Sequence, residues 1–387
     1  MAPRRENPAA DAASTIFVDR ETPKKVFDDA VRATPVDGCA LRVWYGVGGQ
    51  GKTALARELY RMSGTNGEPQ YAHLRPAMLD LHGRSTSDPD LLMVWIRNGF
   101  ARAGLSLPAF DVAFAIMWQA TRGEEPLPTF FKPWLHRIEA GTDDAADDLV
   151  TVSREALQDF VDVIPVVRTL FKRGARWAID KGKRAWLERN REHIRRLSRN
   201  GQIKEPHELS ELMPWMLAQD LNQHLQKHPK ERLVLFIDEY ERVFDAGGMG
   251  VRWQENNFDA RLRTFVTETN GLLALFFSRE RLIWEDSPDW RNNLNGNQHL
   301  LGGLSDCDAN KWLLKVPIAA EAIRAAIIEG ARETNSTAAA VYPLLLDLQV
   351  KHWRNLGAAA TAADFDVNDE TFAQRQQTLV ERLLRDY

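Results

Sequence analysis

Runs of consecutive apolar residues mark the segments of this chain that are predicted to be buried strands. Residues 233–237 and 272–277 are apolar at every position, and residues 41–45 form a third β-prone run. Residues 77–81 and the weaker stretch 299–301 are further candidates. Strands that are apolar on both faces are typical of a parallel sheet covered by helices. The pattern therefore predicts an α/β fold with a parallel sheet of about five strands and the strand 41–45 at its centre.

Apolar positions spaced three or four residues apart predict helices around these strands. One helical face precedes the first strand and consists of Val26, Phe27, Ala30 and Val31. Residues 52–60 are the second helical stretch. Ser305, followed three residues later by Asp308, is typical of a helix start. From there the spacing predicts helices near 306–315, 319–333, 340–352 and 371–385.

The order of these elements predicts five parts. They are a flexible leader (1–14), the first part of an α/β core (15–84), a large helical insertion (85–229), the second part of the core (230–304), and a helical lid with the start of a following helical or winged-helix segment (305–387). No repeat of fixed period is visible, which argues against a solenoid.

Composition narrows the class of protein. The 387 residues are 44% hydrophobic and 27% charged, which excludes a wholly disordered or fibrous chain. The net charge of −4 argues against a globally basic nucleic-acid binder. Cys39 and Cys307 are too few for a disulfide scaffold or a four-cysteine zinc site. No apolar run approaches the roughly 20 residues that span a bilayer, so we expect a cytoplasmic protein without a membrane span.

A glycine-rich segment follows the first strand and carries the clearest chemistry in the chain. Residues 46–53 match the P-loop pattern GxxxxGK[ST]. Backbone amides of such a loop wrap a phosphate, and side chains at its glycine positions would obstruct the turn. We expect Lys52 to bind the β- and γ-phosphates and the Thr53 hydroxyl to bind Mg²⁺. The predicted nucleotide-binding residues here are Gly46, Gly48, Gly49, Gln50, Gly51, Lys52, Thr53 and Ala54.

Two further strand ends carry polar residues that suit the same chemistry. Asp238 and Glu239 follow the run 233–237, where two adjacent acids are costly unless a cation or a polar cleft receives them. We expect Asp238 to hold Mg²⁺ through its water shell and Glu239 to polarise the attacking water. Arg279 follows the run 272–277 and can sense the γ-phosphate if that strand lies beside the strand 41–45, with Arg281 as the alternative. The predicted catalytic residues are thus Glu239, Lys52 and Arg279.

The expected nucleotide is ATP with Mg²⁺. A GTPase needs a base-reading Asn-Lys-x-Asp segment. The one Asn-Lys pair, Asn310-Lys311, is followed by Trp312-Leu313, so this signature is absent.

With these motifs the chain resembles the STAND class of signal-transducing P-loop ATPases, relatives of the NB-ARC, NACHT and origin-recognition-type AAA ATPases. The resemblance rests on residues 17–21 (with Asp19 where the family has glycine), 43–53, 277–284, 301–306 and 341–343 (with Val341 where the family has glycine). It implies that Arg20 lies near the adenine and that Pro343 packs on it. It further implies a slow ATPase used as a switch in signalling or defence, with oligomerisation on ATP binding. The most similar bacterial proteins carry a C-terminal helical-repeat sensor, and we expect a partner or a longer form of the chain to supply that part.

Three other functions stay open at this point. Residues 168–200 hold a local charge of +9 with Trp177 and Trp186 interspersed, which would suit a DNA-acting AAA-type ATPase such as a loader or transposition helper. A solvated helix face or a protein partner is the favoured explanation of that stretch. A nucleotide-binding scaffold without hydrolysis and a small-molecule kinase are the remaining alternatives.

Overall fold

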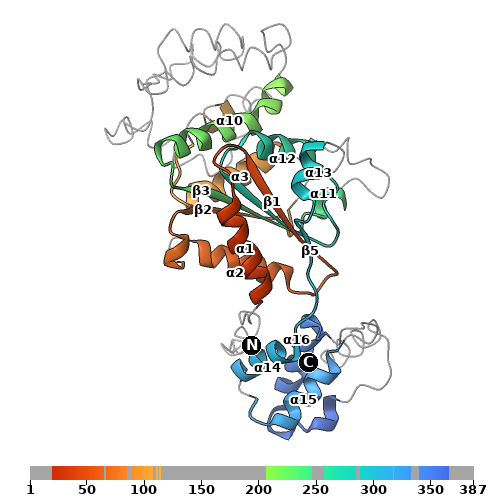
Figure 1. Ribbon diagram of the computed structural model, residues 1–387. Coiled ribbons are helices and arrows are strands. Elements are labelled where there is room, and N and C mark those ends of the chain that lie inside the picture. Colours follow the sequence, from red (N-terminus) through yellow and green to blue (C-terminus); the bar gives the residue numbers. More distant parts are fainter. Residues whose placement is uncertain are drawn as a thin grey trace, which may run out of the picture.

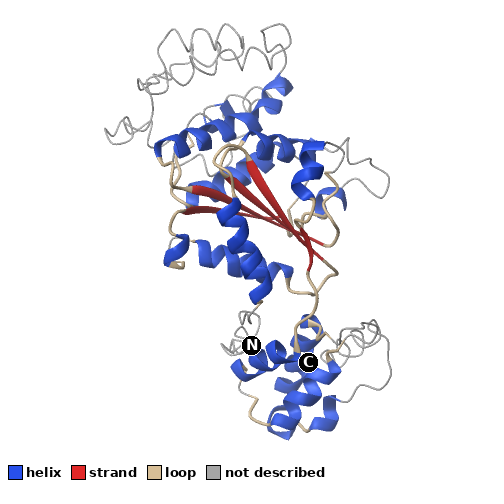
Figure 2. Ribbon diagram, in the orientation of Figure 1, coloured by secondary structure: helices blue, strands red, loops and turns tan. Residues whose placement is uncertain are grey.

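A parallel five-stranded sheet lies at the centre of the larger part of the molecule (Figures 1 and 2). The computed structural model describes residues 20–64, 67–84, 89–107, 110–111, 113–114, 206–245, 257–284, 288–316, 318–332 and 340–365. Its strands are β1 (Cys39–Tyr45), β2 (Leu74–Asp80), β3 (Arg232–Asp238), β4 (Leu272–Ser278) and β5 (Gln298–Leu300). They lie in the order β2-β3-β4-β1-β5, and all four pairings are parallel. The predicted α/β fold with about five parallel strands is confirmed.

The predicted central position of the first strand is wrong. β1 lies next to the edge of the sheet, between β4 and the short strand β5. The middle strand is β4, which is buried at all seven positions. Apolar runs show which segments are buried, but they do not encode which strands become neighbours.

Helices cover both faces of the sheet, as the continuous apolar runs predict. On one face lie α1 (Glu21–Ala33) and α2 (Lys52–Ser63), and on the other lie α3 (Pro89–Arg102), α10 (Pro206–Lys227), α12 (Asn257–Glu268) and α13 (Pro288–Leu294) (Figure 1). The side chains of β1 pack alternately against the two helical layers. Ala40 and Trp44 pack with α1 and α2, whereas Leu41 and Val43 pack into the opposite layer. The alternation follows from the two-residue period of a strand.

The segment predicted as a helical insertion is described only at its ends. α3 packs on β2, and α10 packs on α3 and α12, so both helices belong to the layer on the sheet. Residues 115–205, with the basic stretch 168–200, lie outside the described residues. So do the predicted leader 1–14 and the predicted helix near 371–385.

Three helices after the sheet form a separate packed unit, which we call the helical bundle. They are α14 (Asp306–Lys315), α15 (Glu321–Gly330) and α16 (Pro343–Leu356), followed by short 3-10 turns at Gly357–Ala359 and Ala362–Phe365. The bundle has its own apolar core, and the chain enters it directly after β5 (Figure 1). The predicted capping at Ser305 is confirmed, since its hydroxyl accepts a hydrogen bond from the Asp308 amide at 3.1 Å.

The chain's path through the sheet places a crevice beside β1. From β1 the chain crosses to β2 at the far edge, whereas from β4 it passes over β1 to reach β5. Where connections from neighbouring parallel strands run in opposite directions, the strand ends leave a crevice that commonly binds ligands. Here that crevice lies at the carboxyl ends of β1 and β4. None of the helices in the ranges described above is long and apolar enough to cross a bilayer.

Candidate functional site

Residues from outside the loop between β1 and α2 hold several of its backbone carbonyls. The carbonyl of Gly48 accepts a hydrogen bond from the Tyr342 hydroxyl, and that of Gln50 accepts one from the Arg20 guanidinium. Because a peptide unit is planar and its N–H points away from its C=O, these contacts turn the amides of Gly49 and Gly51 the other way. Among the described residues those two amides have no hydrogen-bond acceptor. Unpaired amides at a helix N-terminus are a ready site for an anion.

Glycine is needed at some positions of this loop and not at others. Gly51 is the N-cap of α2 and has a φ of 81°, a left-handed conformation that suits glycine. Gly49 also has a φ of 81°, and a Cβ there would lie 2.7 Å from the Cβ of Leu344. A Cβ at Gly48 would meet no atom within 4 Å. The expectation that any side chain at Gly48 would obstruct the turn is therefore wrong, because this residue faces open space.

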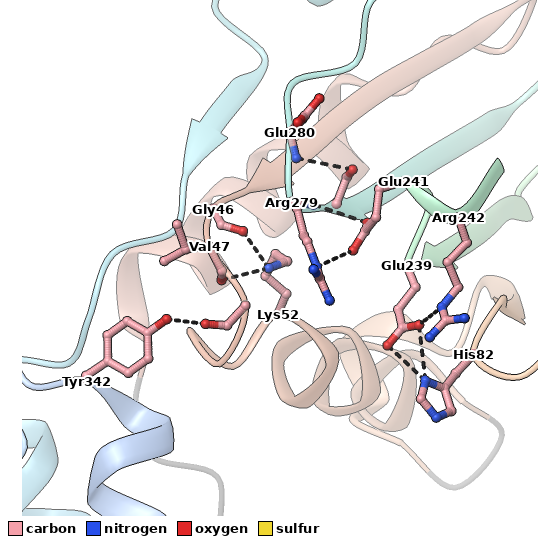
Figure 3. Close-up of polar contacts among 12 residues, drawn as sticks. Gly46, Val47, Lys52, His82, Glu239, Glu241, Arg242, Arg279, Glu280 and Tyr342 are labelled. Atoms are coloured by element: carbon pink, nitrogen blue, oxygen red, sulfur yellow. Dashed lines mark hydrogen bonds and ion pairs between the residues drawn. The ribbon is translucent and has the colours of Figure 1, made fainter. Parts of the chain in front are cut away.

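Lys52 lies over the loop that precedes it. Its ammonium donates hydrogen bonds to the carbonyls of Gly46 at 2.6 Å and Val47 at 3.0 Å (Figure 3). Burial lowers the pKa of Lys52, and the Glu241 carboxylate opposes that shift more than any other charged group. Among the described residues its hydrogen bonds go to neutral carbonyls, so an anion in the loop would give this ammonium a stronger partner.

Asp238 and Thr53 meet at the end of β3. The Thr53 hydroxyl donates a hydrogen bond to the Asp238 carboxylate, whose residue is 2% exposed. Burial raises the pKa of Asp238 to about 6, and the nearby Asp80 carboxylate raises it further, while the Thr53 hydrogen bond opposes both. The described residues contain no cluster of three or more His, Cys, Asp or Glu side chains fit to hold a metal alone. One carboxylate and one hydroxyl do suit Mg²⁺, which is usually bound through one or two protein oxygens together with phosphates.

Glu239 is held in an uncommon backbone conformation. Its φ is 56°, which lies in the left-handed region of backbone conformation that residues other than glycine seldom adopt. Its carboxylate lies 3.1 Å from the ring nitrogen Nδ1 of His82 and also accepts a hydrogen bond from Arg242 (Figure 3). Burial raises the pKa of Glu239, but the hydrogen bonds from Arg242 and His82 outweigh it, so the net shift is downward. Backbone strain of this kind is concentrated at functional sites.

The structure separates the two arginines predicted as sensors. β4 does lie beside β1, as the prediction requires, and Arg279 follows it. Arg279 lines the cavity described next and forms an ion pair with Glu241, with 3.2 Å between Arg279 Nε and the carboxylate. Arg281 instead donates a hydrogen bond to the Tyr45 hydroxyl at 2.9 Å and does not line the cavity.

A cavity of about 630 Å³ brings most of the predicted residues together. Charged side chains, the glycine-rich loop and apolar residues of the helical bundle together line it. The predicted residues in its lining are Arg20, Gly48, Gly49, Gly51, Lys52, Thr53, Ala54, Asp238, Glu239, Arg279 and Pro343. Gly46 and Gln50 lie in the loop but are not part of the lining, and the buried Gln50 amide oxygen lacks a hydrogen-bond partner among the described residues.

Arg20 and Pro343 reach the cavity from opposite ends of the chain. Arg20 donates a hydrogen bond to the carbonyl of Gly302 at 3.2 Å in addition to its bond with Gln50, and burial lowers its pKa to about 10. Pro343 is the first residue of α16. Val341, which replaces the glycine of the resembled motif, forms backbone bridges with Leu304 and Arg332.

Several residues of the site were not predicted from the sequence. Tyr342 and Leu344 hold the loop carbonyls of Gly48 and Gly49, the latter at 3.2 Å. The motif at 341–343 drew attention to this segment of the sequence. It does not predict that Tyr342 contacts a residue 294 positions away. Glu241 lies two residues past Glu239 and was missed because only the adjacent acid pair suggested chemistry. Trp312 in α14 also lines the cavity.

Comparison with protein-family models found no match for this chain, and a search of curated proteins found none either. The function proposed for the chain therefore depends on the residues that line the cavity.

Proposed function

We propose that the chain binds ATP with Mg²⁺ in the 630 Å³ cavity, hydrolyses it slowly, and uses the nucleotide as a STAND-type switch in signalling or defence. The observation that carries this proposal is the convergence of the loop 46–53, Asp238, Arg279 and the start of α16 on one cavity. The cations and unpaired amides of the lining suit a triphosphate. Its apolar residues, including Trp312, suit a purine ring.

The predicted catalytic and metal-binding residues each have a role in this proposal. The loop amides and Lys52 bind the phosphates, and Arg279 binds the γ-phosphate. Thr53 and Asp238 would hold Mg²⁺, which when bound would neutralise phosphate charge. Glu239 accepts a hydrogen bond from the attacking water and orients it, a role that suits a carboxylate whose pKa is lowered.

The helical bundle is the element that would respond to the nucleotide. Tyr342 and Leu344 bind carbonyls of the same loop that lines the cavity. A phosphate that shifts this loop therefore alters the contacts of the bundle, which would act as the lid. The output would be a conformational change, a homo-oligomer, or the binding of a protein partner.

Phosphate release tests the proposal. Lys52→Ala should lower Mg²⁺-dependent release of phosphate from ATP by at least about 100-fold, because it removes a charge that stabilises the transferred group. Lys25→Ala removes an exposed lysine of α1 that does not line the cavity, and it should leave release unchanged. Equal rates for Lys52→Ala and the wild type would contradict the proposal.

A further inference from the structure

Glu241 is paired with Arg279, one of the two cations that are expected to bind a γ-phosphate. One of its carboxylate oxygens lies 3.2 Å from Nε of Arg279, and the other accepts a hydrogen bond from the Arg279 amide at 3.1 Å (Figure 3). Glu241 is also the charged group that affects the pKa of Lys52 most, and it raises that pKa. All three side chains line the same cavity.

The two partners of this ion pair are not equally constrained. The Glu241 side chain is 17% exposed, whereas that of Arg279 is 67% exposed. Glu241 follows Tyr240, which is buried and bonded to Asp259. The carboxylate is therefore the fixed partner, and Arg279 is the partner that can move.

We propose that Glu241 takes the place of the γ-phosphate on Arg279 when no triphosphate is bound, and so sets how strongly the site prefers ATP over ADP. This inference rests on the proposed function. A γ-phosphate that approaches Arg279 must displace a carboxylate already bound to it, and it must approach a like charge. A diphosphate does not reach that position and does not meet this cost.

Glu241→Gln tests the inference because it removes the charge and keeps the size of the side chain. The glutamine oxygen can still accept from the Arg279 amide, so a purely structural role would be preserved. We expect the dissociation constant of Mg²⁺·ATP to fall at least about fivefold, a typical size of coupling between two groups, and that of Mg²⁺·ADP to change less than about twofold. Calorimetric titration of the full chain with each nucleotide measures both.

Glu280→Gln is the matched control. Glu280 is adjacent to Arg279 in sequence but is exposed, does not line the cavity, and points away from Lys52 (Figure 3). It should leave the ratio of the two dissociation constants unchanged. Should Glu241→Gln fail to fold, as judged by its thermal melt, Glu241→Ala is expected to shift the ratio in the same direction.

The role of Arg279 is tested by repeating the substitution in an Arg279→Ala background. The gain in ATP affinity should largely disappear there, because no arginine remains to be released. An unchanged ratio of dissociation constants in Glu241→Gln, or an undiminished gain in the Arg279→Ala background, would overturn the inference while ATP binding by the wild type still supports the proposed function. A wild-type chain that binds neither nucleotide would overturn both.

Discussion

Three acidic residues at the end of β3 lie within four positions of one another, yet each has a different environment. Asp238 is buried beside Thr53, Glu239 is paired with His82 and Arg242, and Glu241 is paired with Arg279. Because the environments differ, so do the chemical properties. The buried Asp238 carboxylate is suited to a cation, whereas Glu239, whose pKa is lowered by its partners, is suited to orienting a water molecule.

The environment of Asp238 predicts a pH-dependent stability. Its pKa is raised from 3.8 to about 6 by burial, so the folded protein binds this proton more tightly than the unfolded chain does. The stability that protonated Asp238 contributes is therefore lost as the pH rises from about 4 to about 6. Asp238→Asn is neutral throughout, and without Mg²⁺ it should exceed the wild type in unfolding free energy by up to about 3 kcal/mol at pH 7.

Urea unfolding of the two proteins between pH 4 and pH 8 measures this difference. The two stabilities should converge near pH 4. A difference that stays constant over the whole range would show that Asp238 does not titrate as described.

The position of Glu239 predicts that a variant at this residue still binds ATP but hydrolyses it far more slowly. Glu239→Gln removes the negative charge that orients water, so phosphate release from ATP should fall by about 100-fold or more. Binding of ATP should persist, because Glu239 is not expected to bind the phosphates. Phosphate release measured beside calorimetric binding separates the two effects. Unaltered release in the variant would contradict the role of Glu239, and absence of release from both proteins would favour a nucleotide-binding scaffold without hydrolysis.

At the scale of elements, the local sequence pattern predicts where strands and helices lie, but it does not predict which of them come into contact. The apolar runs located all five strands, and the helix predicted at 306–315 coincides with α14. The order of strands was not predictable from these runs, because β3 and β4 are both buried at almost every position although they occupy different places in the sheet. The loop motif likewise predicted Lys52 and Thr53 but not Tyr342, whose contact with Gly48 exists only once the bundle has docked.

The contact between the loop and α16 predicts a contrast between two neighbouring glycines. Gly49→Ala introduces a Cβ 2.7 Å from Leu344 in a left-handed conformation, and it should lower the unfolding free energy by about 1–3 kcal/mol. Gly48→Ala places a Cβ in open space and should change stability by less than about 0.5 kcal/mol. Thermal melts without nucleotide measure both. Equal losses would mean that the loop and the bundle do not pack as described.

At the scale of the whole molecule, the cavity is made by two packed units, the sheet with its helices and the helical bundle. The backbone joins them directly after β5 (Figure 1). Hydrogen bonds also join them at the loop, from the Tyr342 hydroxyl to the Gly48 carbonyl and from the Leu344 amide to the Gly49 carbonyl. A ligand at the loop is therefore placed to alter how the two units contact each other.

This arrangement predicts a nucleotide-dependent change in assembly. With Mg²⁺·ATP the molar mass in solution should rise above the 44.0 kDa of one chain, and with Mg²⁺·ADP it should not. Glu239→Gln should prolong the ATP-bound assembly, since it retains the γ-phosphate. Multi-angle light scattering measures the mass. A mass that is the same with both nucleotides would argue against an oligomerising switch.

Calorimetric titration of the wild-type chain and Lys52→Ala with Mg²⁺·ATP is the most direct test of the central claim, that the cavity between sheet and bundle binds the triphosphate. The wild type should bind one ATP per chain, and Lys52→Ala should bind it at least about tenfold more weakly, because the ammonium that meets the phosphates is gone. Absence of binding heat for the wild type with both ATP and GTP, or equal affinity in the variant, would contradict the claim.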